Sequence, residues 1–175
     1  PYDLYLASDL AAGLVRDYRC YIFLNMFHAD ETVREAIRAQ LAGDKVAVWI
    51  YAPGFVDRSL SVDYIEALTE FRLECHHTEW GLNTVITNFE HPITEDLSPA
   101  TFIGTDSRIG PVFTCIDPDA IPLGALVFTR GRSRTGFAVK ELSDHRAVWI
   151  GAPSVAAPVL RGIARYAGVH VYSDA

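Results

Sequence analysis

Residues 45–51, which read Lys-Val-Ala-Val-Trp-Ile-Tyr, decide the fold class of this 175-residue chain. The segment is apolar without alternation, a pattern typical of a central parallel strand that is covered on both faces. A near-copy, Ala-Val-Trp-Ile, occurs at residues 147–150, and both copies are followed one residue later by Ala-Pro. We interpret the two as central strands that leave one sheet at the same edge. A domain duplication is not indicated, because the sequences between them do not match.

Helices are predicted after these strands and before the first of them. Asp30 is a good N-cap for a helix over about 31–42, whose apolar positions share one face, and Gly43 is suited to end it. A shorter helix is predicted from Ser61 to about 69, and another over 155–167.

The two ends of the chain together predict an α/β fold. Further strands are expected at 2–6, 18–25 and 169–172. Strand–helix–strand alternation implies right-handed crossovers and a mostly parallel central sheet, as in a flavodoxin-like or Rossmann-like three-layer sandwich. The middle, about 71–145, is expected to be a β-rich insertion with short strands at 72–80, 84–88, 111–116, 124–129 and 135–141.

Composition limits the domain organisation and the partners. A length of 175 residues fits a single domain, and 50% hydrophobic with 21% charged residues excludes a disordered chain. The net charge of −7 speaks against nucleic acid and acidic membranes, which need a basic face. The longest apolar run, 46–52, is far below the ~18 residues of a membrane span. Three cysteines without a C-x-x-C spacing argue against a disulfide framework or zinc knuckle. For lack of a disulfide framework we expect a cytoplasmic chain. No cofactor is expected.

The candidate binding site lies where the parallel strands end. In open α/β sheets, ligands bind beyond the carboxyl ends of the strands. Aromatic side chains at strand ends and in loops bind sugars or anchor subunit contacts. The resulting crevice or interface candidates are Asn25, Phe27, Tyr51, Pro53, Gly54, Phe55 and Trp80.

A catalytic nucleophile is the first feature to look for at such an edge. It needs Ser or Cys at a tight strand-to-helix turn. The turn after residue 50 has Ala52 where a nucleophile is expected, and the turn after residue 150 offers Ser154, which we interpret as a turn or cap residue. Cys20 and Cys115 lie in apolar strands and fit a core role. No catalytic residue is therefore predicted.

Two other clusters carry side chains that could form chemical sites. Cys75, His77 and Glu79 alternate and carry zinc-type ligand atoms, but three successive alternating positions rarely converge on one ion, so no metal site is predicted. Carboxylates for glycoside hydrolysis are present without a motif that selects a pair, and we interpret them as a solvated acidic surface: Glu66, Glu70, Glu74, Glu79 and Glu90.

An arginine-rich segment follows residue 129. Arg130, Arg132 and Arg134 alternate through a predicted hairpin loop, and with Arg108 they could contact an anion or a partner. A solvated hairpin tip is the simpler interpretation. No glycine-rich phosphate-binding sequence is present, so nucleotide binding has no motif support.

The strand and helix segments at both ends resemble a known domain. Residues 21–25, 30–42, 49–54 and 164–173 are similar to the β-galactosidase trimerisation domain, which lies behind the catalytic barrel of large glycoside-hydrolase-like proteins. The resemblance implies the class I glutamine-amidotransferase-like, flavodoxin-like α/β fold. It is weaker across 71–145. Residues 1–6 would then correspond to the second strand of the domain, and we expect the chain to be part of a longer multidomain protein.

The resemblance implies an absence of catalysis in these 175 residues. Amidotransferase-like relatives carry a cysteine at the turn where this chain has Ala52 or a neighbouring residue, and the catalytic glutamates of β-galactosidases belong to the barrel. We therefore expect a non-catalytic accessory or oligomerisation module of a carbohydrate-active enzyme. Its partners would be a second copy or the catalytic barrel of the parent chain, with carbohydrate as a further candidate.

Two alternatives stay open. One is a sugar-binding module that uses the crevice at the strand ends. The other is a stand-alone amidotransferase-like hydrolase, for which Ser154 and Cys75 are the only candidate nucleophiles.

Overall fold

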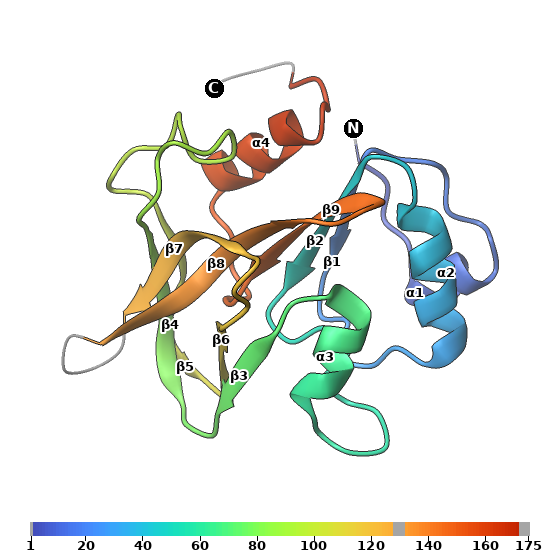
Figure 1. Ribbon diagram of the computed structural model, residues 1–175, viewed down its shortest axis with the longest axis horizontal. Coiled ribbons are helices and arrows are strands. Elements are labelled where there is room, and N and C mark those ends of the chain that lie inside the picture. The colour runs from blue at the N-terminus through green and yellow to red at the C-terminus, as the bar shows by residue number, and fades with distance from the viewer. Residues whose placement is uncertain (1, 128–131, 172–175) are drawn as a thin grey trace.

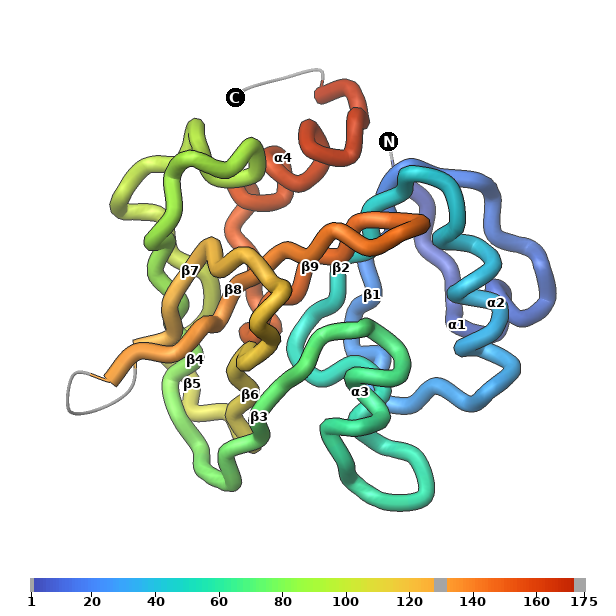
Figure 2. Tube along the Cα trace, viewed as in Figure 1, coloured from blue at the N-terminus to red at the C-terminus, as the bar shows by residue number. Residues whose placement is uncertain are grey.

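The computed structural model describes residues 2–127 and 132–171 (Figures 1 and 2). The helices are α1 (Ala7–Ala11), α2 (Glu31–Leu41), α3 (Val62–Thr69) and α4 (Ala157–Tyr166). The strands are β1 (Cys20–Phe23), β2 (Lys45–Ile50), β3 (Leu73–His76), β4 (Trp80–Ile86), β5 (Phe102–Ile109), β6 (Val112–Cys115), β7 (Ile121–Val127), β8 (Ser133–Glu141) and β9 (His145–Ile150). The predicted α/β class is confirmed.

The strands form one mixed, strongly curled sheet. Its main path is β1-β2-β9-β8-β7-β4-β5, and β6 joins β3 to β8. Among the described strands, only the β1–β2 and β2–β9 pairs are parallel, so the prediction of a mostly parallel sheet is wrong in that respect. The reason is the short turn between β8 and β9, which reverses the chain and makes this pair antiparallel without a crossover helix.

The repeated sequence forms two neighbouring strands, as predicted. In the parallel β2–β9 pair, Ala47 lies opposite Ala147 and Trp49 opposite Trp149. Both tryptophans are fully buried. Each copy is apolar throughout because its strand lies in the middle of the sheet and is covered on both faces.

Helices cover both faces of the parallel strands. In Figure 1, α1, α2 and α3 lie on one side and α4 on the other. The predicted caps are confirmed: the Asp30 carboxylate accepts from the Val33 N–H at 2.9 Å, and the Ser61 hydroxyl accepts from the Asp63 N–H at 3.1 Å. Gly43 follows α2 with φ of +98°, a conformation that favours glycine.

Several predicted strands are corrected. Residues 2–6 lead into α1 instead of forming a strand, and residues 169–171 are not a strand either, while Tyr172 lies outside the described residues. The predicted strand 72–80 is interrupted after His76 by a turn, in which the Thr78 N–H donates to the His76 carbonyl at 2.8 Å. β5 was not predicted, because its sequence is polar and carries charges at Asp106 and Arg108.

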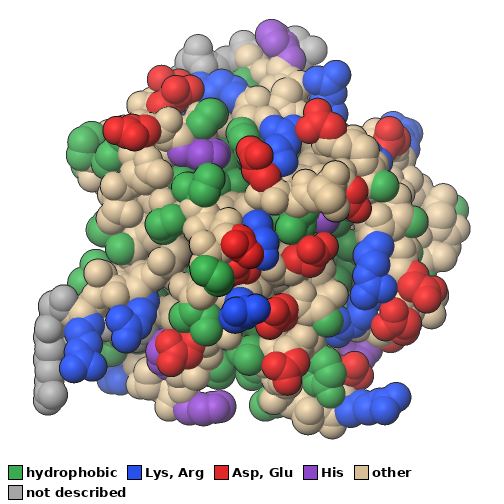
Figure 3. Space-filling model, in the orientation of Figure 1, with side chains coloured by type: hydrophobic (Ala, Val, Ile, Leu, Met, Phe, Trp, Pro, Cys, Tyr) green, Lys and Arg blue, Asp and Glu red, His purple; other side chains and the backbone are tan. Residues whose placement is uncertain are grey.

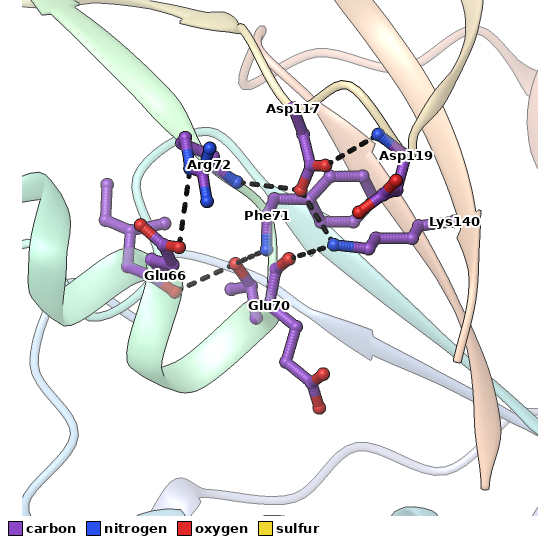
Figure 4. Close-up of polar contacts among 9 residues, drawn as sticks. Glu66, Glu70, Phe71, Arg72, Asp117, Asp119 and Lys140 are labelled. Atoms are coloured by element: carbon purple, nitrogen blue, oxygen red, sulfur yellow. Dashed lines mark hydrogen bonds and ion pairs between the residues drawn. The ribbon is translucent and has the colours of Figure 1, made fainter. Parts of the chain in front are cut away.

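A partly buried ion pair joins the β-rich region to α3 (Figure 4). The Lys140 ammonium lies 2.8 Å from the Asp117 carboxylate and donates to the Glu70 carbonyl, at the end of α3, at 2.9 Å. Burial by itself would raise the pKa of Asp117. The hydrogen bonds from Lys140 and from the backbone N–H groups of Asp119 and Arg72 outweigh it and hold that pKa below its ordinary value.

None of the helices within residues 2–127 and 132–171 is long and apolar enough to cross a membrane.

Candidate functional site

The carboxyl ends of β1 and β2 form a corner built from left-handed residues. Asn25, just after β1, has φ of +51°, and Tyr51, just after β2, has φ of +65°. Gly54, three residues later, has φ of +74°. A bulky residue such as tyrosine is rare in this region, and strained residues cluster at functional sites. The corner lies at the sheet edge where the sequence predicts a ligand crevice.

Backbone contacts hold the two loops of this corner together. The Gly54 N–H donates to the Met26 carbonyl at 2.7 Å, and the Val56 N–H donates to the Phe27 carbonyl at 2.8 Å. Gly54 also lies tightly against α3, because a Cβ atom there would be 3.0 Å from Leu68 Cδ2. The predicted tight corner after the central strand is confirmed.

A buried arginine lies beneath the same corner. Arg34 of α2 donates from Nε to the Ala29 carbonyl at 2.7 Å and from Nη1 to the Tyr64 carbonyl at 3.0 Å. Its side chain therefore connects the start of α2 to α3. No sequence pattern singled out Arg34, because an arginine in an amphipathic helix normally faces solvent.

Aromatic rings fill the space above the strand ends. The Tyr51 ring meets the rings of Phe27 and Phe113 edge to face, with centroids 6.1 and 5.4 Å apart. Phe55 meets Phe113 at 4.9 Å. The Tyr51 hydroxyl donates to the Pro111 carbonyl at 2.5 Å, and burial, followed by the nearby Cys75 thiol, raises the pKa of Tyr51 to about 12. Tyr51 is thus a neutral, fixed side chain at neutral pH.

The structure brings most of the predicted site residues together but buries several. Asn25, Phe27, Tyr51, Pro53, Gly54 and Phe55 all lie at this corner. Phe27 is 40% exposed, whereas Tyr51, Pro53, Gly54 and Phe55 are buried. Trp80 lies elsewhere: it starts β4, and its indole N–H donates to the Val127 carbonyl at 3.0 Å. Binding roles for these residues stay predictions.

Two residues of the corner were not predicted from the sequence. Phe113 and Pro111 come from the β-rich region, about 60 positions after Tyr51. The sequence carries no signal that places them here, since Phe113 looks like any core residue of a short strand.

The residue in the left-handed conformation at this turn is Tyr51, the neighbour of Ala52. The Tyr51 N–H still donates to the Ile150 carbonyl at 2.7 Å before the chain turns. Cys75 interacts electrostatically with Tyr51, but burial raises the pKa of its thiol, so the reactive thiolate is disfavoured. Ser154 is exposed in the loop before α4. No described serine or cysteine occupies the strained corner position.

The other chemical clusters do not assemble into sites. The described residues contain no group of three His, Cys, Asp or Glu side chains that could hold a metal ion. Arg108 donates to the Glu79 carbonyl at 3.3 Å, Arg132 and Arg134 are exposed, and Arg130 lies outside the described residues. The five candidate carboxylates are all exposed: Glu66, Glu70, Glu74, Glu79 and Glu90.

A hollow lies at the opposite, amino-terminal edge of the parallel strands. Its volume is about 610 Å³, and Lys45, Arg146 and Arg165 contribute to its walls. Each of these cations already pairs with a carboxylate, at 2.6 Å from Asp17, 3.0 Å from Asp44 and 3.0 Å from Asp96 respectively. The hollow also faces the C-terminal end of α4, whose dipole disfavours an anion.

Comparison with solved structures identifies the fold. A cold-adapted β-galactosidase from Rahnella sp. R3 matches with a TM-score of 0.67 and 14% identity, over 87% of this chain and 23% of the β-galactosidase. The chain has the fold of the β-galactosidase trimerisation domain, which is class I glutamine-amidotransferase-like. The resemblance inferred from sequence is therefore confirmed at the level of the fold.

The same fold occurs in chains that are not β-galactosidases. A ThuA-like protein from Bacteroides uniformis matches with a TM-score of 0.59 and 14% identity, over 91% of this chain and 74% of that one. The mmIFT52 N-terminal domain matches with a TM-score of 0.56 and 10% identity, over 99% and 83%. No family model and no curated protein sequence matches this chain.

Proposed function

We propose that this chain is a non-catalytic accessory module of a β-galactosidase-like, carbohydrate-active protein, in which it supports assembly or shapes the mouth of the active site. The proposal includes a cytoplasmic location, which agrees with its three free cysteines. It treats the 175 residues as one α/β domain of a longer protein.

The corner at Tyr51 is the observation that carries the proposal. A catalytic relative with this fold needs an exposed nucleophile at the strained turn after a central strand. Here that conformation belongs to a tyrosine whose hydroxyl donates to a backbone carbonyl and whose ring is enclosed by Phe27 and Phe113. The strained backbone of such a turn is present, but a packed tyrosine side chain stands where a nucleophile and the open space beside it would be.

The similarity to β-galactosidases supports the carbohydrate context. The chain spans about a quarter of the length of the β-galactosidase chains that it matches. A module of about a quarter of such a protein fits an accessory role beside a larger catalytic domain. The exposed carboxylates agree with this, because none of them forms a buried acid–base pair of the kind that glycoside hydrolysis needs.

An activity assay on the purified chain tests the proposal. We expect no turnover of chromogenic galactosides and no hydrolysis of glutamine. Turnover that is abolished by replacing a single glutamate, Ser154 or Cys75 would overturn it. Calorimetric titration with galactosides is expected to give no saturable heat; heat that disappears in Phe27→Ala would instead support the sugar-binding alternative.

A further inference from the structure

The segment between β4 and β5, residues 87–101, consists of turns and packs against α4 (Figure 1). Ile93 in this segment is fully buried. Gly162 of α4 lies so close to the Ile93 carbonyl that a Cβ atom there would not fit, and the Arg165 guanidinium lies 3.0 Å from the Asp96 carboxylate. A segment without regular secondary structure is thus held on the helix by a small number of contacts.

His91 closes the turn that carries Ile93. Its carbonyl accepts from the Thr94 N–H at 2.8 Å and from the Glu95 N–H at 2.9 Å. Its ring atom Nδ1 lies 3.2 Å from the backbone nitrogen of Ile93 and accepts from that N–H. A neutral imidazole has one acceptor nitrogen and one donor nitrogen, so the ring proton must be on Nε2.

The His91 ring also connects the turn to α4. It meets the half-buried ring of Tyr166, near the end of α4, with centroids 5.1 Å apart. The guanidinium of Arg146, in β9, lies 4.6 Å from the centroid of the same Tyr166 ring. The His91 side chain therefore belongs to a junction between the segment, the helix and the central sheet.

The charges around His91 act in both directions on its protonation. Glu141 of β8 and Glu95 of the segment favour the protonated ring, but burial outweighs them and holds the pKa of His91 below its ordinary value of 6.5. Arg146, beside Tyr166, is a further cation at the junction. The neutral ring is therefore the form that the folded chain holds at neutral pH.

Protonation would remove the hydrogen bond that closes the turn. A protonated imidazole donates from both nitrogens and accepts at neither, so the Ile93 N–H would face another donor inside a buried turn. The His91 ring is only half-buried, so protons can reach it. Figure 3 shows a histidine among acidic and hydrophobic side chains at the surface where Figure 1 places the segment beside α4.

We propose that His91 is a pH switch for the docking of residues 87–101 on α4. The neutral ring holds the segment closed, and protonation of Nδ1 opens it. Opening exposes apolar side chains that are buried in the closed form, Ile93 and Leu97 among them. This regulation goes beyond the proposed accessory role and does not depend on it.

Amide hydrogen exchange followed by NMR between pH 7.5 and 5.5 tests the proposal. Carboxylates stay ionised in this window, so histidines are the side chains that titrate. Because the folded-state pKa lies below 6.5, the stabilisation by the neutral ring is complete above about pH 6.5 and is lost as the pH falls through the folded-state pKa. We expect the protection of the Ile93 and Glu95 amides to fall by about threefold to tenfold, since opening takes up one proton. Ring nitrogen shifts at pH 7.5 are expected to show the Nε2–H tautomer of His91.

An asparagine variant separates the ring proton from the turn. Asn88 of the same segment accepts from the Glu90 N–H, two residues on, at 2.9 Å, so His91→Asn can accept from the Ile93 N–H in the same way. Asparagine does not titrate, and we expect the protection of the Ile93 amide to become independent of pH in this window. The matched control is His77→Asn, at an exposed histidine in the turn after β3, which should keep the pH dependence of the unmodified chain.

Three results would overturn the switch. They are an Nδ1–H tautomer of His91 at pH 7.5, amide protection in the unmodified chain that is constant from pH 7.5 to 5.5, and an unchanged pH dependence in His91→Asn. The first two are measured on the unmodified chain, so they decide the matter even where the asparagine variant leaves the turn open at neutral pH. Thermal melting at pH 7.5 checks that each variant is folded.

Discussion

Trp49 and Trp149 lie in the same local sequence but have different tertiary environments. They lie opposite each other in the parallel β2–β9 pair and are equally buried. The Trp149 indole N–H donates to the Tyr51 carbonyl at 3.0 Å. Among the described residues the Trp49 N–H has no hydrogen-bond partner, and its ring stacks on Phe23 with centroids 4.3 Å apart. The first tryptophan is therefore held by packing, and the second by packing and a hydrogen bond.

Phenylalanine substitutions are expected to separate these two contributions. Trp149→Phe removes volume and also leaves the Tyr51 carbonyl without its indole donor, whereas Trp49→Phe removes volume alone. We expect Trp149→Phe to lower the free energy of unfolding by about 1 kcal/mol more than Trp49→Phe, measured by urea denaturation. Trp49→Ala, which leaves a cavity, should cost about 3–5 kcal/mol. Equal costs for the two phenylalanine variants would contradict the assigned hydrogen bond.

At the scale of elements, the ion pair between Asp117 and Lys140 fixes the end of α3 against β8. Its two side chains are only 4% and 16% exposed, so neither charge is well solvated without the other. Breaking one partner of such a pair leaves an uncompensated buried charge. The pair is thus a connection between the helical layer and the β-rich region.

Asp117→Asn is expected to lower the free energy of unfolding by about 3 kcal/mol at neutral pH. Because the pKa of Asp117 in the folded chain lies below its ordinary value of 3.8, the ionised carboxylate favours folding above about pH 4. This contribution is lost as the pH falls through the folded-state pKa, and the variant should lack that part of the acid dependence. Asp119→Asn, at an exposed neighbour, is the control and should keep it. Identical acid profiles for both variants would refute the assignment.

The docking of α4 depends on a close approach of backbones. A Cβ atom at Gly162 would lie 2.0 Å from the Ile93 carbonyl oxygen, so Gly162→Ala must push α4 away from the segment before β5. We expect a loss of about 1–3 kcal/mol in thermal or chemical denaturation. At Gly81 the nearest atom would be 3.6 Å away, so Gly81→Ala should change stability little. If both substitutions are tolerated alike, the close packing of α4 is not as described.

At the scale of the whole molecule, the curled sheet makes the parallel strands and the β-rich region one structure. β8 pairs with β7 on one side and with β9 and β6 on the other, and buried residues from both regions form one hydrophobic cluster. The Tyr51–Pro111 hydrogen bond adds a direct link between them. Neither region can lose its packing without exposing the core of the other.

Tryptophan fluorescence can test this coupling. Trp80 reports on β4 and Trp149 on β9, so two variants that each retain one of these as the sole tryptophan follow different regions. Within each variant, we expect the urea midpoint by fluorescence to coincide with the midpoint by far-UV circular dichroism. A fluorescence transition that clearly precedes the circular dichroism transition in either variant would show that the regions unfold separately.

The sequence by itself determined the features that are encoded within a few neighbouring residues. The Asp30 and Ser61 caps, the two buried Ala-Val-Trp-Ile strands and the corner after β2 all follow from local patterns, as does the α/β class. Capping and hydrophobic periodicity are short-range effects, so these predictions did not need the rest of the chain.

Only the tertiary structure decided the direction of β8, the existence of β5 and the contents of the corner. The sequence of a strand does not specify which strand it pairs with. The prediction of parallel pairing therefore covered more of the sheet than the parallel pairs of the structure do. The structure decides that Tyr51, the neighbour of Ala52, takes the strained position, and the Tyr51 N–H still bonds to the Ile150 carbonyl of β9. Phe113 and Pro111 enclose it from about 60 positions away, a placement set by the summed burial of the whole core and by no local signal.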